Sequence, residues 1–62
     1  MTILDLRNRT GLSQNKFATK FHISVRTLQR WEQGNTDTPE HILYMIEHIL
    51  NLEDMLNRLK NN

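Results

Sequence analysis

Apolar residues recur at helical spacing along most of the chain, and capping residues divide this pattern into separate helices. A first helix is predicted over residues 2–10, with Ile3 and Leu6 facing inward. Gly11 follows directly and ends it. Ser13 can then accept hydrogen bonds from the first amides of a second helix. The pattern therefore predicts an all-α chain of short helices.

The second and third predicted helices lie close together in the sequence. In the second helix, Phe17, Ala18 and Phe21 fall on one side, and the small Ala18 lies where the two helices approach each other. The third helix is predicted over about residues 25–33, and Gly34 ends it because glycine adopts positive φ without strain. Two short helices joined by a tight turn are typical of a helix-turn-helix.

The third predicted helix has two different faces. Leu28 and Trp31 share an apolar face, and we expect Trp31 to be buried and structural. Polar side chains with forked hydrogen-bonding groups recur on the opposite face: Arg26, Gln29, Arg30 and Gln33. Arginine can bond guanine, and glutamine can bond adenine, through two hydrogen bonds in the major groove. This face predicts sequence-specific DNA binding, and the alternative is that these side chains serve only solubility.

Residues 2 to about 50 resemble the Cro/phage-repressor (XRE-type) helix-turn-helix family. The resemblance rests on Leu12-Ser13-Gln14, Phe17-Ala18, Phe21, Ile23-Ser24, Thr27-Leu28, Trp31-Glu32, Gly34 and Pro39. It implies a compact, lambda-repressor-like bundle of four or five helices, here with an extended C-terminal helix, that binds operator DNA, usually as a dimer. His22 departs from the family, which often has glycine there, although histidine is among the residues that tolerate positive φ.

The resemblance also implies which residues contact DNA. The residues expected to contact bases are Ser24, Val25, Arg26, Gln29 and Arg30. The residues expected to contact phosphates are Gln14, Lys16, Gln33, Asn35 and Thr36. In the family, a basic residue of the first helix often pairs with an acidic residue at the end of the third. We therefore expect an Arg7–Glu32 ion pair, the alternative being two unrelated surface charges.

The charges are unevenly distributed along the chain, although the net charge of its 62 residues is only +1. Residues 1–33 carry six basic side chains against two acidic ones, whereas residues 34–62 carry two basic against five acidic. The half that holds the predicted motif is therefore the basic half, as binding to a phosphate backbone requires.

Composition excludes several other classes of protein. The length allows one domain with a modest core. There is no cysteine, and no two of the three histidines are four residues apart, so we expect no metal and no other cofactor. We find neither a long apolar run nor a signal-peptide layout, so we expect a cytoplasmic protein without membrane contact. No catalytic set or phosphate loop appears, so we expect neither an enzyme nor a small-molecule substrate.

The last predicted helix carries more apolar surface than the motif can cover. It starts near Pro39, after which a heptad seam is formed by Ile42, Met45, Ile49, Leu52, Leu56 and Leu59. A second apolar flank contains Leu43, Ile46, Leu50 and Met55. We expect residues 1–50 to form the DNA-binding part, and residues 51–62 to be a helical extension of the same domain. Its proposed contacts with a second copy are Leu52, Met55, Leu56 and Leu59. The alternative is a bend near Asn51 that folds residues 52–60 back onto the monomer.

Three functions follow from this pattern. The first is a transcriptional repressor that binds a palindromic operator in double-stranded DNA as a homodimer. The second is an antitoxin or accessory autoregulator, whose C-terminal helix binds a different protein. The third is a protein-only adaptor that keeps the fold without binding DNA.

Overall fold

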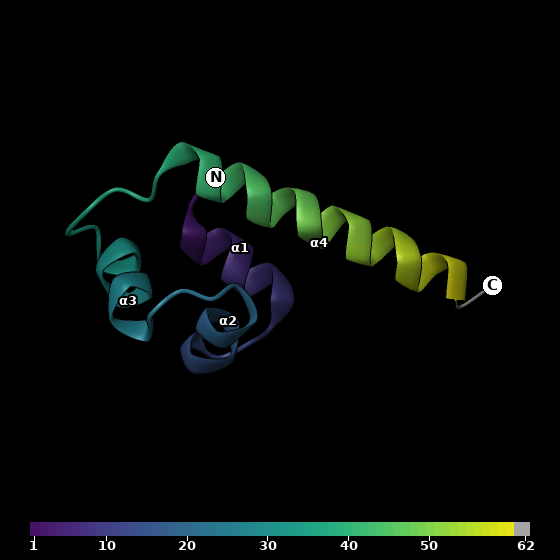
Figure 1. Cartoon of the computed structure of the whole chain (residues 1–62), viewed down its shortest axis with the longest axis horizontal. Helices are drawn as coiled ribbons and strands as arrows, with labels where there is room; N and C mark the ends of the chain where they lie inside the picture. Colours follow the sequence, from purple (N-terminus) through teal and green to yellow (C-terminus); the bar gives the residue numbers. More distant parts are fainter. Residues whose placement is uncertain (61–62) are drawn as a thin grey trace.

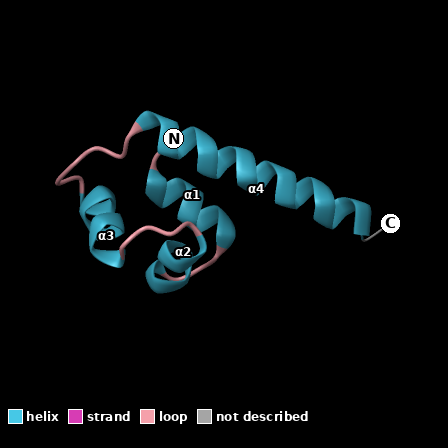
Figure 2. Cartoon of the chain, in the orientation of Figure 1, coloured by secondary structure: helices cyan, strands magenta, loops and turns pink. Residues whose placement is uncertain are grey.

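The computed structural model describes residues 1–60 and shows four helices joined by two tight turns and one longer loop (Figure 1, Figure 2). Three short helices lie on one side of the first half of a long fourth helix, and the rest of that helix extends past them. The helices are α1 (Ile3–Thr10), α2 (Gln14–Lys20), α3 (Val25–Gln33) and α4 (Glu40–Lys60). The all-α fold with a helix-turn-helix is thus confirmed, with four helices in the described residues.

Short polar residues determine where the first three helices begin. Thr2 and Asp5 form a capping box at the start of α1, in which each side chain accepts a hydrogen bond from the other residue's amide. Ser13 accepts from the amide of Lys16 at the start of α2, and Ser24 caps α3 in the same way. These side chains satisfy amides that have no partner within the helix.

Left-handed backbone conformations produce the sharp changes of direction between helices. Gly11 and Gly34 end α1 and α3 with φ of 72° and 79°. His22 lies in the turn between α2 and α3 with φ of 57°, as expected from its place in the motif. The amide of Ile23 then bonds the carbonyl of Ala18 at 2.9 Å, which closes the turn.

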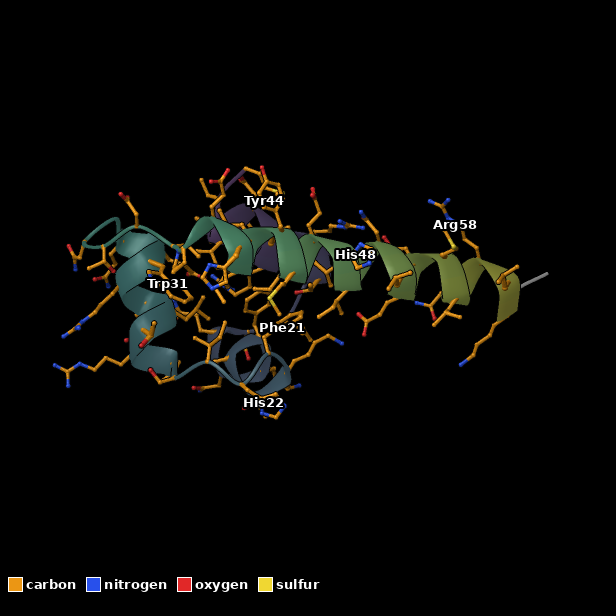
Figure 3. All side chains as sticks on the ribbon, turned by 45° about the horizontal axis from the view of Figure 1, so that its top comes forward. Phe21, His22, Trp31, Tyr44, His48 and Arg58 are labelled. Carbon is orange, nitrogen blue, oxygen red and sulfur yellow. The ribbon has the colours of Figure 1, made fainter. Side chains whose placement is uncertain are left out.

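All four helices contribute to one core. The buried residues are Ile3, Leu6, Phe17, Ala18, Leu28, Ile46 and Leu50. Phe17 and Leu28 are completely inaccessible to solvent, and Ala18 lets α2 and α3 pack closely. Trp31 packs against this core on the same side of α3 as Leu28, as expected, but it is only partly buried. In Figure 3 Trp31 lies on the side of α3 that is turned toward α4.

The long helix α4 runs without interruption through Asn51, so the structure does not contain the bend considered above. It begins at Glu40, one residue later than expected, and the carbonyl of Pro39 accepts from the amides of Ile42 and Leu43. Residues 61 and 62 of the predicted extension lie outside the described residues. Because α4 extends past the bundle, the molecule measures 42 × 21 × 17 Å.

The face of α4 that packs on the bundle is not the predicted heptad seam. Ile46 and Leu50 enter the core, whereas Met45 and Ile49 of the seam are exposed. Of the first half of the seam, only Ile42 packs against the core, and it is partly buried. Leu43, Ile46 and Leu50 of the second flank meet the core, and the seam lies exposed from Met45 onward.

Beyond Leu50, polar contacts hold α4 against the bundle. Arg9 of α1 pairs with Asp54 at 2.6 Å and also donates to Asn51. Lys20 of α2 pairs with Glu53 at 2.8 Å. These side chains are partly solvent-exposed, so each pair stabilises the arrangement only modestly.

Candidate nucleic-acid interface

The outer face of α3 carries four exposed polar side chains. They are Arg26, Gln29, Arg30 and Gln33. At 3.6 residues per turn they fall within about 100° of arc around the helix. Leu28 and Trp31 occupy the opposite side and attach α3 to the core. The packing of α3 therefore leaves this polar face turned outward.

Two residues expected at the base-contacting surface have additional roles in the fold. The hydroxyl of Ser24 accepts from the amide of Thr27 at 3.1 Å and donates to the Thr27 hydroxyl at 2.8 Å. Val25 is half-buried and packs against the core. Among the five expected base contacts, Ser24, Arg26, Gln29 and Arg30 are exposed and only Val25 is half-buried.

The fold decides which of the six basic side chains of residues 1–33 remain unpaired. Three of them form ion pairs: Arg7 with Glu32, Arg9 with Asp54 and Lys20 with Glu53. Within residues 1–60, the other three have no acidic partner: Lys16, Arg26 and Arg30. All three are exposed and belong to α2 and α3. Within residues 1–33, the basic side chains without an acidic partner thus all lie on the two helices of the motif, where an anionic backbone would attract them. Arg58 and Lys60, at the far end of α4, also have no acidic partner within residues 1–60.

The expected Arg7–Glu32 ion pair is confirmed. Arg7 donates from Nε to Glu32 Oε2 at 2.6 Å and from Nη2 to Glu32 Oε1 at 3.0 Å. Its third nitrogen donates to the carbonyl of Leu12, at the entrance to α2. The hydrogen bonds from Arg7, and then the one from Gln14, hold the pKa of the Glu32 carboxyl below its ordinary value, although burial raises it. Glu32 is therefore ionised at neutral pH and ties α1 to α3.

The side chain of Gln14, expected to contact a phosphate, is held by two hydrogen bonds within the protein. Its Nε2 donates to Glu32 Oε1 at 2.9 Å, and its Oε1 accepts from Gln29 Nε2 at 3.3 Å. These partners lie 18 and 15 residues away in the sequence, so no local pattern indicates the contacts. Gln14 thus joins a base-contacting candidate to the ion pair beneath it.

The loop after α3 contains the remaining expected phosphate contacts. Asn35 donates from its amide to the carbonyl of Arg30 at 3.0 Å, and from its side chain to Gln33 at 3.3 Å. Gln33, Asn35 and Thr36 are all exposed at the C-terminal end of α3. Thr36 also lines a shallow groove of about 540 Å³ between this loop and the start of α1, into which Asp37 brings a negative charge.

No helix within residues 1–60 is both long and apolar enough to span a membrane. Over that range, no three histidine, cysteine or acidic side chains are grouped so that they could hold a metal ion.

Comparison with known proteins agrees with this geometry. A family model described as helix-turn-helix matches residues 3–54, which is most of the chain and includes all of α1, α2 and α3. A search of curated proteins found no match, and a search of solved structures also found none. The chain belongs to the helix-turn-helix family of the Cro and phage-repressor (XRE) type and is a DNA-binding transcription regulator.

Proposed function

We propose that the protein is a transcriptional repressor that binds a palindromic operator as a homodimer, with α3 in the major groove. The observation that carries the proposal is the outer face of α3, where Arg26, Gln29 and Arg30 are exposed and both arginines lack an acidic partner within residues 1–60. A bound repressor acts by excluding the transcription machinery from the DNA it covers. This activity places the protein in the cytoplasm with that DNA.

We assign base recognition to the long side chains on the outer face of α3. Arg26 and Arg30 are four residues apart and so project side by side from adjacent turns of α3. Each can donate two hydrogen bonds to O6 and N7 of a guanine. Ser24 and Val25 lie at the start of α3, where the helix first meets the groove, and would contribute shorter contacts.

Replacing Arg26 or Arg30 with alanine should relax the preference for one base pair in each half-site. A good two-bond contact contributes ~1–3 kcal/mol of discrimination between bases. The measurement is the affinity of each variant for a panel of operators, each changed at one position. Equal weakening on every sequence would instead make that arginine a phosphate contact.

Backbone contacts are assigned to side chains around the ends of α2 and α3. They are Gln14, Lys16, Gln33, Asn35 and Thr36. Gln14 and Lys16 lie in the first turn of α2, where the free amides of a helix favour an anion. Lys16 has no acidic partner within residues 1–60, so its charge is available to a phosphate.

Replacing Lys16 with alanine should make log affinity less dependent on log salt concentration by about one unit of slope, because one fewer counterion is released. Lys20→Ala on the same helix is the matched control. Lys20 is already paired with Glu53, so its removal should change the slope less. Binding measured at several salt concentrations provides both values, and equal slopes for Lys16→Ala and the wild type would remove Lys16 from the interface.

Homodimerisation is assigned to the exposed seam of α4. From Met45 onward, the five residues of the seam are spaced 4-3-4-3 within α4, and their exposed fractions range from 38% to 68%. They are Met45, Ile49, Leu52, Leu56 and Leu59, with Met55 beside them. This heptad spacing matches that of two helices that pack along their length, so a second α4 is a natural occupant. Such pairing buries surface that a single 62-residue chain leaves in water.

Selection of binding sites from random DNA tests the proposal directly. The wild-type protein should enrich two inverted half-sites with centres about one helical turn apart, ~34 Å. Single half-sites would contradict the homodimer, and no enrichment would contradict DNA reading. If the seam instead bound a different protein while the chain stayed monomeric, the antitoxin or accessory autoregulator would replace the homodimeric repressor.

A further inference from the structure

A chain of hydrogen bonds runs from the partly buried ion pair between α1 and α3 to the outer face of α3. Arg7 donates to both oxygens of Glu32, and Gln14 donates to Glu32 Oε1 at 2.9 Å. Gln29 then donates to Gln14 Oε1 at 3.3 Å. The side chain of Glu32 is only 7% exposed and that of Arg7 20%, whereas Gln29 is exposed. The chain is therefore anchored at a shielded ion pair and ends among the expected base contacts.

The chemistry of each group allows only one order of donors and acceptors along these hydrogen bonds. An ionised carboxylate only accepts hydrogen bonds, so the NH2 group of the Gln14 amide must face Glu32. The Gln14 carbonyl oxygen consequently faces the other way, and an oxygen can be met only by a donor. The donor is the NH2 group of Gln29. Turning the Gln14 amide around would place its oxygen against a carboxylate and its NH2 group against the NH2 group of Gln29, and would lose both bonds.

We infer that Glu32, acting through Gln14, fixes which end of the Gln29 amide faces the DNA and so helps to determine operator specificity without contacting a base. This inference rests on the proposed reading of DNA by α3. Glutamine reads adenine by accepting from N6 and donating to N7. A freely turning amide offers donor and acceptor in either order, whereas the oriented Gln29 amide offers only one. Gln14 and Glu32 are thus positioning residues for this contact.

Gln14→Met tests the inference because methionine keeps the length of the side chain but cannot bond Glu32 or Gln29. The readout is affinity across a panel of operators, each changed at one position. The preference for one base at the position read by Gln29 should fall about fivefold or more. The upper limit is the discrimination lost when a two-bond contact is removed completely. Loss of the proposed phosphate contact of Gln14 weakens all sequences by the same factor, so the test is the change in base preference and not the overall affinity. Uniform weakening with every base preference kept would overturn the inference.

Two further variants separate orientation from other effects. Glu32→Gln replaces an obligate acceptor with an amide, so Gln14 can turn, and the same base preference should relax. Because this change also weakens the ion pair with Arg7, its folding is checked by thermal unfolding. In the Gln29→Met background, Gln14→Met should change no base preference further. A further change at the same position in that background would show that Gln14 does not act through Gln29.

Gln33→Met is the matched control, because Gln33 is an exposed glutamine of α3 outside this chain of bonds. As a proposed phosphate contact, Gln33 should on replacement weaken binding to all operators by the same factor and leave every base preference as in the wild type. Failure of the inference and failure of the proposed function have different signatures. If the wild type selects no sequence, the proposed reading of DNA fails. If the wild type selects an operator and Gln14→Met keeps every preference, only the role of Glu32 and Gln14 is wrong.

Discussion

Replacing Leu56 and Leu59 with lysine should convert the protein into a monomer that binds its operator weakly and without cooperativity. Both leucines are more than half exposed in the single chain, so the change removes no core packing from the monomer. In the proposed dimer it would place four positive charges in an apolar seam, where unpaired charges are strongly disfavoured. Two monomers would then bind their half-sites independently of each other.

Light scattering after size-exclusion chromatography measures the change in mass, and operator binding measures the loss of cooperativity. The wild type should also show a melting temperature that rises with protein concentration, because dimerisation stabilises the folded state by mass action. Leu56→Lys alone should already weaken the dimer, and Asn57→Lys is its matched control, since it adds the same charge one residue away and outside the seam. A wild type that stays monomeric when concentrated, with a melting temperature independent of dilution, would contradict this interface.

Replacing Phe17 with alanine should leave the protein largely unfolded, with or without DNA. Phe17 is completely buried and packs in the core shared by the four helices, with its ring centroid 4.8 Å from that of Phe21. Truncation of a buried phenylalanine costs ~3–5 kcal/mol. Small domains have a total stability of about 5–15 kcal/mol, and a chain of this size belongs near the lower end.

Circular dichroism during thermal unfolding measures this loss. Trp31→Ala is an informative comparison, because Trp31 is larger than Phe17 but only partly buried, and its removal should cost less. If the Trp31 variant were less stable than the Phe17 variant, Trp31 would contribute more to the stability of the fold than its partial burial indicates. A Phe17 variant with an unchanged melting temperature would contradict the assignment of this core.

The local structure could be predicted because its causes are local. Serine caps, glycine ends and the spacing of Phe17, Ala18 and Leu28 act within a few residues, so the bounds of α3 and the positive φ of His22 were predictable. The candidate face of α3 follows from the same periodicity, because side chains opposite a buried stripe must face outward. The Arg7–Glu32 pair required more than periodicity, and its prediction came from the family resemblance.

Helical periodicity defines the faces of α4 relative to one another but not which of them turns toward the bundle. Two apolar flanks were visible in the sequence, and only packing against α1 decided that Ile46 and Leu50 enter the core while the seam stays exposed. The same packing brings Asp54 and Glu53 to Arg9 and Lys20 and so pairs these two charges, whereas Lys16, Arg26 and Arg30 stay without an acidic partner within residues 1–60. The sequence by itself thus determined the helices, their caps and the helix-turn-helix. The tertiary structure decided which charges are neutralised, which apolar face is exposed and how Gln14 connects Glu32 to Gln29, because these depend on contacts between residues far apart in the chain.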